Sequence, residues 1–228
     1  MARAKVFLRY EADGSSEAAK VETWKEALRP YIRNHRMKEF KLCPEKSALL
    51  IIDMQRFFLV PDSHAYVPNA TDTIQNVKAL ADAYREARLP VIYTYHAVLS
   101  REESGIMDRW WGDIQREGGE MAKIIPALSP KKSDIVIRKT RYSAFAGTEL
   151  EKILRDRGVE QVVITGVLTH LCCDTTARAA FMRDFEVYFG IDCTATYNDD
   201  LHAGTLRALA DGFAMPITCR EVLKCLER

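Results

Sequence analysis

Short apolar runs alternate with amphipathic stretches along most of the chain. The runs are rich in Val, Ile and Leu, which is typical of strands buried on both faces of a sheet. They predict strands at 48–52, 89–94, 134–137, 161–165, 186–191 and 215–218. Between the runs, helical spacing of apolar residues predicts helices at 71–87, 148–157, 175–184 and 200–211. Strands that alternate with helices pair in parallel, so the predicted fold class is α/β: a three-layer α-β-α sandwich with a mostly parallel sheet of about six strands.

Two regions fall outside this alternation. Residues 100–119 show no clear period, and we expect them to be irregular. Ser16 to Lys38 predicts a charged amphipathic helix, with Trp24 and Leu28 among the residues available for burial. That helix packs either on its own domain or on a neighbouring subunit, and the sequence leaves both open. We expect an N-terminal extension over 1–45 and one α/β domain over 46–228.

Composition excludes several classes of function. The 228 residues carry a formal net charge of +1, which gives no reason to expect nucleic acid or an acidic surface as a partner. No apolar stretch approaches the length of a membrane span, and the N-terminus lacks an apolar signal core. The six cysteines show no repeated spacing, which is typical of reduced thiols, so we expect a cytoplasmic protein.

Three predicted strands lead to residues that can do chemistry. Asp53 follows strand 48–52, Lys139 follows strand 134–137, and Cys172 lies in the turn between strand 161–165 and the next helix. Taken singly, a charge at a strand end usually meets solvent, and a cysteine usually packs in a core. The carboxyl ends of parallel strands meet at one edge, however, where α/β proteins bind their ligands. A cysteine at a helix N-terminus is also expected to favour the thiolate, so Cys172 is a candidate nucleophile.

Around these residues the chain resembles the isochorismatase-like hydrolase superfamily, which includes nicotinamidases, N-carbamoylsarcosine amidohydrolases and isochorismatases. The resemblance spans about 46–221. It rests on Ile52-Asp53-Met54-Gln55, on Lys139-x-Arg141-Tyr142-Ser143-Ala144-Phe145 and on Gly166-Val167-x-Thr169-x-x-Cys172.

The resemblance implies a catalytic triad of Asp53, Lys139 and Cys172. It also implies a cis peptide bond between Val167 and Leu168, which would turn the Leu168 N–H toward the site. The N–H groups of Leu168 and Cys172 would then form an oxyanion hole.

The resemblance does not decide between the reactions that members of the superfamily catalyse. The segment 139–145 and the pair Trp111-Gly112 are most similar to isochorismatases, which cleave a vinyl ether and typically carry Gly where this chain has Cys172. A cysteine at this position favours a cysteine-dependent hydrolase that cleaves a C–N bond of a small amide, ureide or carbamoyl substrate through a thioester. The alternatives are a vinyl ether hydrolase that uses Asp53 as general acid, with Cys172 not catalytic, and a non-catalytic binding protein on the same fold.

Five further residues are candidates for substrate binding. Trp111 lies in the segment 107–113, which we expect to form a lid or a subunit interface. Arg109 and Arg141 are candidates for holding a substrate carboxylate, and we also assign Tyr142 and His96 to substrate binding. The expected partner is a small-molecule substrate, and the resemblance implies a homo-oligomer.

We expect neither a metal nor another cofactor. Nicotinamidases in the superfamily bind a metal through an Asp-x-His motif after the second strand. This chain has Thr94-Tyr95-His96 there, so the Asp is absent and nicotinamidase is disfavoured. Asp62-Ser63-His64 has the same spacing but lies in the loop after the first strand, so we interpret it as loop.

Overall fold

The predicted strands form one parallel sheet. The computed structural model describes residues 17–68 and 70–227, and in that part of the chain the strand order is β3-β2-β1-β4-β5-β6 with every neighbouring pair parallel. The strands are β1 (Ser47–Ile52), β2 (Val91–His96), β3 (Ile135–Lys139), β4 (Gln161–Val167), β5 (Glu186–Ala195) and β6 (Met215–Ile217). The order reverses between β1 and β4, which is where open α/β sheets bind ligands.

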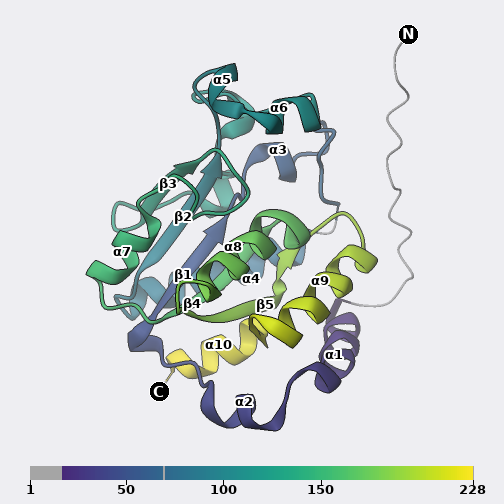
Figure 1. Cartoon of the computed structure of the whole chain (residues 1–228), viewed down its shortest axis with the longest axis vertical. Helices are drawn as coiled ribbons and strands as arrows, with labels where there is room; N and C mark the ends of the chain where they lie inside the picture. The colour runs from purple at the N-terminus through teal and green to yellow at the C-terminus, as the bar shows by residue number, and fades with distance from the viewer. Residues whose placement is uncertain (1–16, 69, 228) are drawn as a thin grey trace.

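Helices cover both faces of this sheet, which confirms the three-layer sandwich. One face packs against α1 (Glu17–Leu28), α7 (Leu150–Asp156), α8 (Asp174–Phe181) and α9 (Asp199–Gly212). The other packs against α3 (Arg56–Leu59), α4 (Ala70–Glu86) and α10 (Cys219–Leu226). Figure 1 shows α8 and α9 in front of the sheet, with α5 and α6 beyond one end of its strands.

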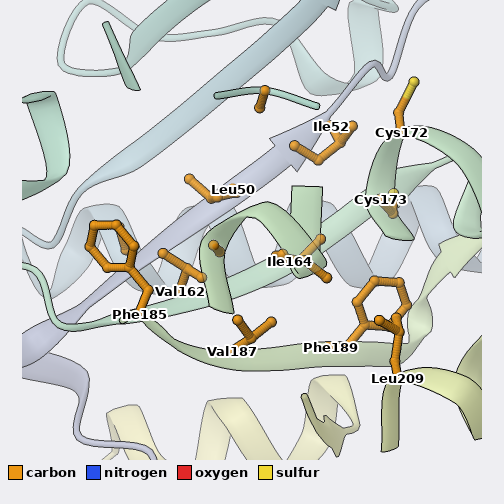
Figure 2. Close-up of a cluster of buried hydrophobic side chains, with 14 of the residues drawn as sticks. Leu50, Ile52, Val162, Ile164, Cys172, Cys173, Phe185, Val187, Phe189 and Leu209 are labelled. Carbon is orange, nitrogen blue, oxygen red and sulfur yellow. The ribbon is translucent and has the colours of Figure 1, made fainter. Parts of the chain in front are cut away.

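The side chains of β1 explain the two cores. All six residues of β1 are buried, and successive side chains point to opposite faces. Leu50 and Ile52 enter one apolar cluster, and Leu49 and Ile51 enter the other. Figure 2 shows the first cluster, in which Leu50 and Ile52 lie among residues of β4 and β5.

The single helix predicted over 16–38 is divided into two helices in the structure. α1 ends at Leu28, a 3-10 turn follows at Arg29–Tyr31, and a separate helix α2 covers Asn34–Glu39. Pro30 explains the break, because proline lacks the N–H that a continuing helix requires. Ser16, the first residue of the prediction, lies outside the described residues. α1 packs on its own chain against α9, where Lys20 pairs with Asp199 at 3.0 Å.

The structure also differs from the sequence prediction in the region 100–119 and at the C-terminus. The region 100–119 contains two short helices, α5 (Arg101–Ser104) and α6 (Ile106–Trp111), so it is not wholly irregular. Helix α10 was not predicted, although Thr218 and Glu221 form a capping box at its start. The remaining short turns are 3-10 helices at Pro44–Lys46, Glu120–Ala122 and Pro126–Leu128. None of the described helices combines the length and the apolar character that crossing a bilayer requires.

Candidate active site

The sheet brings Asp53, Lys139 and Cys172 into one buried cluster, which we call the floor. Asp53 follows β1, Lys139 ends β3, and Cys172 lies in a π-helical turn (Thr169–Cys173) between β4 and α8. The Lys139 ammonium lies 2.7 Å from Asp53 Oδ2 and donates to Cys172 Sγ at 3.3 Å. The side chains of Asp53 and Lys139 are both 0% exposed. The structure therefore places Lys139 in contact with both of the other predicted site residues.

Lys139 is held as a cation by its surroundings. Besides Asp53 and Cys172, its ammonium donates to the backbone carbonyl of Arg141 at 2.8 Å. Burial alone would lower the pKa of Lys139, but the Asp53 carboxylate and the Cys172 sulfur outweigh it and raise that pKa. A lysine with two hydrogen bonds and one ion pair at its ammonium has little freedom to move.

Asp53 adopts a backbone conformation that is uncommon for a residue with a side chain. Its φ is +49°, in the left-handed region, and such outliers concentrate at functional sites. Thr94 of β2 holds the carboxylate by donating from Oγ1 to Asp53 Oδ1 at 2.8 Å. The other oxygen, Oδ2, is left facing Lys139.

The surroundings of Cys172 favour the neutral thiol over the thiolate. Burial raises the pKa of Cys172 to about 12, with the Asp53 carboxylate acting in the same direction and the Lys139 ammonium acting against both. Burial therefore acts against the thiolate that the helix N-terminus was expected to favour. Figure 2 shows Cys173 inside the apolar cluster and Cys172 at its edge, beyond the end of β1.

The end of β4, just before the turn that carries Cys172, makes a close backbone contact with β1. Gly166 has a φ of +108°, and a Cβ at this position would lie 2.1 Å from the Ile52 carbonyl oxygen, so only glycine fits. The Val167–Leu168 peptide bond that follows is cis, as the resemblance implied. The oxyanion hole of Leu168 and Cys172 stays a prediction.

A cavity of about 930 Å³ opens above the floor. Cys172 lines it, but Asp53 and Lys139 do not. The walls are mainly apolar, with aromatic rings from Phe57, Phe58, Tyr66, Trp111, Tyr142 and Tyr197. A molecule in the cavity therefore meets the triad through the sulfur of Cys172.

Three of the predicted binding residues line this cavity. Trp111 of α6 donates from its indole N–H to the Tyr142 hydroxyl at 2.8 Å, so the two rings form one wall. His96, at the end of β2, is 4% exposed, and its Nδ1 lies 3.1 Å from Gln115 Oε1. Burial, reinforced by the Lys139 ammonium, lowers the pKa of His96. Its Nε2 has no hydrogen-bond partner within the described part of the chain, which leaves one buried polar atom for a ligand.

The two predicted arginines do not line the cavity. Arg109 is exposed on α6, and Arg141 donates to the backbone carbonyls of Glu103 and Thr140 at 3.1 and 2.7 Å. The guanidinium of Arg141 therefore holds α5 through the carbonyl of Glu103. We call residues 101–112, which contain α5 and α6, the mouth of the cavity. The prediction that these arginines hold a substrate carboxylate does not agree with their positions.

Other cavity residues were missed by the sequence analysis. His64 lies in the cavity wall, where it pairs with Asp113 at 3.4 Å and contacts the Phe57 ring edge-on. The Asp-x-His spacing at 62–64 was the signal for it, but we interpreted that segment as loop. Tyr66 and Tyr197 carried no signal, because isolated aromatic residues after strands are usually core residues.

The residues near His96 do not fit a metal centre. The described residues contain no group of three or more His, Cys, Asp or Glu side chains placed to hold a metal ion. Thr94, which occupies the position of the nicotinamidase Asp, binds the Asp53 carboxylate instead.

The model of the isochorismatase domain matches residues 47–221. Among curated relatives, nicotinamidase 3 of Arabidopsis thaliana is 38% identical over 183 residues, which cover 79% of this chain and 88% of that protein. The isochorismatase of Bacillus subtilis (strain 168) is 31% identical over 81% of this chain and 59% of that protein. Among solved structures, a cysteine hydrolase from Pseudomonas syringae pv. phaseolicola 1448A is similar with a TM-score of 0.80 and 28% identity, covering 87% of this chain and 97% of that one.

Proposed function

The chain belongs to the isochorismatase family of hydrolases, and from this premise we propose that it cleaves the C–N bond of a small uncharged amide, ureide or carbamoyl compound through a thioester on Cys172. The position of Cys172 carries the proposal. It is the one member of the triad that lines the cavity, whereas Asp53 is completely buried behind it. A substrate carbon can therefore reach the sulfur directly but not the carboxylate.

The first step forms the covalent bond. Because the thiol is neutral at rest, Asp53 takes its proton as the sulfur attacks the carbonyl carbon, and the fixed charge of Lys139 stabilises the sulfur while negative charge develops. The former carbonyl oxygen receives hydrogen bonds from the N–H groups of Leu168 and Cys172. In other enzymes, loss of one such donor costs about 3–4 kcal/mol.

The second step releases the products. Asp53 returns its proton to the leaving nitrogen, and the C–N bond breaks to give a thioester. Asp53 then removes a proton from water, which attacks the thioester carbon; the C–S bond breaks, and the departing sulfur takes this proton back from Asp53 to restore the thiol and the carboxylate. Atoms balance with water as the only co-substrate, and Lys139 stays charged throughout.

The lining of the cavity supports an uncharged substrate. In the part of the chain that the structure describes, no Lys or Arg lines the cavity, although Asp113 does. A substrate with carboxylates, such as isochorismate, would lack a cationic partner there. Both reactions require Asp53 to exchange a proton with the substrate, so the burial of Asp53 does not separate them. The absence of a cationic lining residue from the described part of the chain favours the amide-type reaction over the vinyl ether alternative.

The first test is a substrate panel. The relative named nicotinamidase 3 and the aromatic cavity walls make nicotinamide the first amide to test, despite the missing Asp-x-His motif. Ammonia release should be measured with nicotinamide, aliphatic amides, ureides and carbamoyl compounds, and pyruvate release with isochorismate. Turnover of an amide that disappears in Cys172→Ala supports the proposal. Pyruvate release that survives in Cys172→Ala contradicts it.

A further inference from the structure

The turn Thr169–Cys173 is tied to α9 and to the segment that connects β5 with it. Thr169 Oγ1 lies 3.0 Å from His202 Nδ1, and His170 Nδ1 lies 2.6 Å from Thr196 Oγ1. Thr169 is 0% exposed and His202 is 4% exposed, and neither lines the cavity. The contact between them is therefore made inside the protein, on the same turn as the nucleophile.

The second nitrogen of His202 fixes the direction of this hydrogen bond. His202 Nε2 lies 3.1 Å from the carbonyl oxygen of Ile191, which can only accept. Nε2 therefore carries the ring hydrogen, and Nδ1 of the neutral ring is an acceptor. Burial lowers the pKa of His202 to about 4, which keeps the ring neutral near pH 7. The Thr169 hydroxyl consequently donates to Nδ1.

The ring of His202 is supported from its other side. Trp24 of α1 contacts it with a centroid distance of 4.5 Å. The N-terminus of α9, which carries His202, is capped by Asn198, whose side chain accepts from the Leu201 N–H at 2.9 Å. A ring held by a carbonyl, a hydroxyl and an indole has one defined position.

We propose that His202 is a positioning residue, which holds Cys172 against Lys139 by anchoring the turn through Thr169. The inference rests on the cysteine mechanism proposed above. Thr169 lies between Leu168 and Cys172, which are the two predicted oxyanion donors. Without the Nδ1 acceptor, the Thr169 hydroxyl would be buried without a partner, and the turn would shift to satisfy it. Such a shift lengthens the 3.3 Å contact between Cys172 Sγ and the Lys139 ammonium.

Two amide variants separate the two nitrogens of the ring. In His202→Asn, the side-chain oxygen can take the place of Nδ1 and still accept from Thr169. In His202→Gln, the side-chain NH₂ can take the place of Nε2 and still donate to Ile191, but the acceptor for Thr169 is lost. Thr169→Val removes the hydroxyl at nearly constant volume.

The primary measurement is the rate at which iodoacetamide alkylates Cys172, resolved from the other five cysteines by peptide mapping and recorded across pH 6 to 10. We expect His202→Gln and Thr169→Val to slow alkylation at pH 8 by about fivefold or more, and His202→Asn to stay within about twofold of wild type. The double variant Thr169→Val/His202→Gln should be no slower than either single variant, because both break the same bond. Equal rates and pH profiles in all of these proteins would overturn the inference.

Thermal unfolding provides the control for a purely structural role. Each amide variant removes one of two hydrogen bonds, so similar decreases in Tm are expected for His202→Asn and His202→Gln. An alkylation rate that follows Tm rather than the presence of the acceptor would overturn the inference. The proposed function fails separately, if Cys172→Ala retains amide turnover.

Discussion

Asp53 and Lys139, at the floor of the cavity, are fully buried, whereas Trp110 and Ile106, in the helix at its mouth, are 74% and 60% exposed. At the floor, strand ends position each group, and the Lys139 ammonium has three partners within 3.3 Å. At the mouth, two short helices are held by the Trp111–Tyr142 hydrogen bond and by Arg138, which pairs with Glu103 at 2.9 Å. The sheet therefore fixes the buried cluster, and a lightly packed segment supplies Met107, Trp111 and Gly112 to the cavity wall.

The largest effect should come from the floor. Cys172→Ala should reduce turnover by at least about a thousandfold, because it removes the attacking atom. The matched control is Cys173→Ala, which truncates the neighbouring buried thiol but should leave turnover within a few-fold of wild type. The measurement is the rate of ammonia release by the two purified variants and by wild type. A Cys172→Ala protein that keeps more than a few per cent of the wild-type rate would sink the covalent mechanism.

Lys139→Met should reduce turnover by about a hundredfold. The Lys139 ammonium lowers the pKa of Cys172, so its removal should raise that pKa further and shift thiol alkylation to higher pH. It also leaves Asp53 without its buried partner, which should destabilise the protein by about 3–5 kcal/mol.

Alkylation of Cys172 by iodoacetamide across pH 6 to 10 measures the shift caused by Lys139→Met, and urea unfolding measures the stability. Lys123→Met, at an exposed lysine, is the control. Identical alkylation profiles for wild type and Lys139→Met would show that the lysine does not act on the sulfur.

Lowering the pH should decrease the free energy of unfolding, because the buried ring of His202 resists protonation. Its pKa falls from 6.5 to about 4 on burial, so between these values the unfolded chain binds a proton that the folded protein does not. The free energy of unfolding should therefore decrease as pH falls through this range, by up to about 3 kcal/mol from this residue. His96 and His170 have lowered pKa values and act in the same direction.

Urea unfolding at pH 7 and pH 4.5 tests this acid dependence. His202→Asn should lose less stability on acidification than wild type. Equal losses in wild type and His202→Asn would contradict the prediction.

The smallest effect should come from the mouth. Trp111→Ala should raise KM by about tenfold and change kcat by less than threefold, because it removes one apolar wall and no reacting group. Trp110→Ala is the matched control, since its ring does not line the cavity, and both constants should stay near wild type. Steady-state kinetics on the best amide of the panel provides the measurement. A Trp111→Ala variant that loses kcat but keeps KM would place this ring in the chemistry instead.

The same contrast explains what the sequence could predict. The strand ends and the triad were predictable because the apolar runs that form β1, β3 and β4 lead directly to Asp53, Lys139 and Cys172, and parallel pairing brings their ends together. The structure of the mouth could not be predicted, because α5 and α6 are too short to show a helical period. Arg141 illustrates the limit: its place in the motif suggested a substrate contact, but its guanidinium binds the carbonyl of Glu103.

The charge state of Cys172 was also beyond the sequence. The position at the start of a helix favours the thiolate, whereas burial raises the pKa of Cys172, and the depth of burial depends on tertiary packing. His202 and Thr169 lie 33 residues apart, and no local pattern reveals that they meet.

The central pairing of β1 with β4 also bears on the order of folding. It joins distant segments, as in the hydrogen bond between Thr165 and the Leu50 carbonyl, 115 residues apart. Contacts between distant segments form slowly, because a long loop must lose entropy before they stabilise anything. Asp53 and Cys172 lie on the two sides of this seam, so neither half of the chain can hold a working site by itself. The return of enzymatic activity during refolding should therefore coincide with closure of the seam and lag behind the return of helical signal.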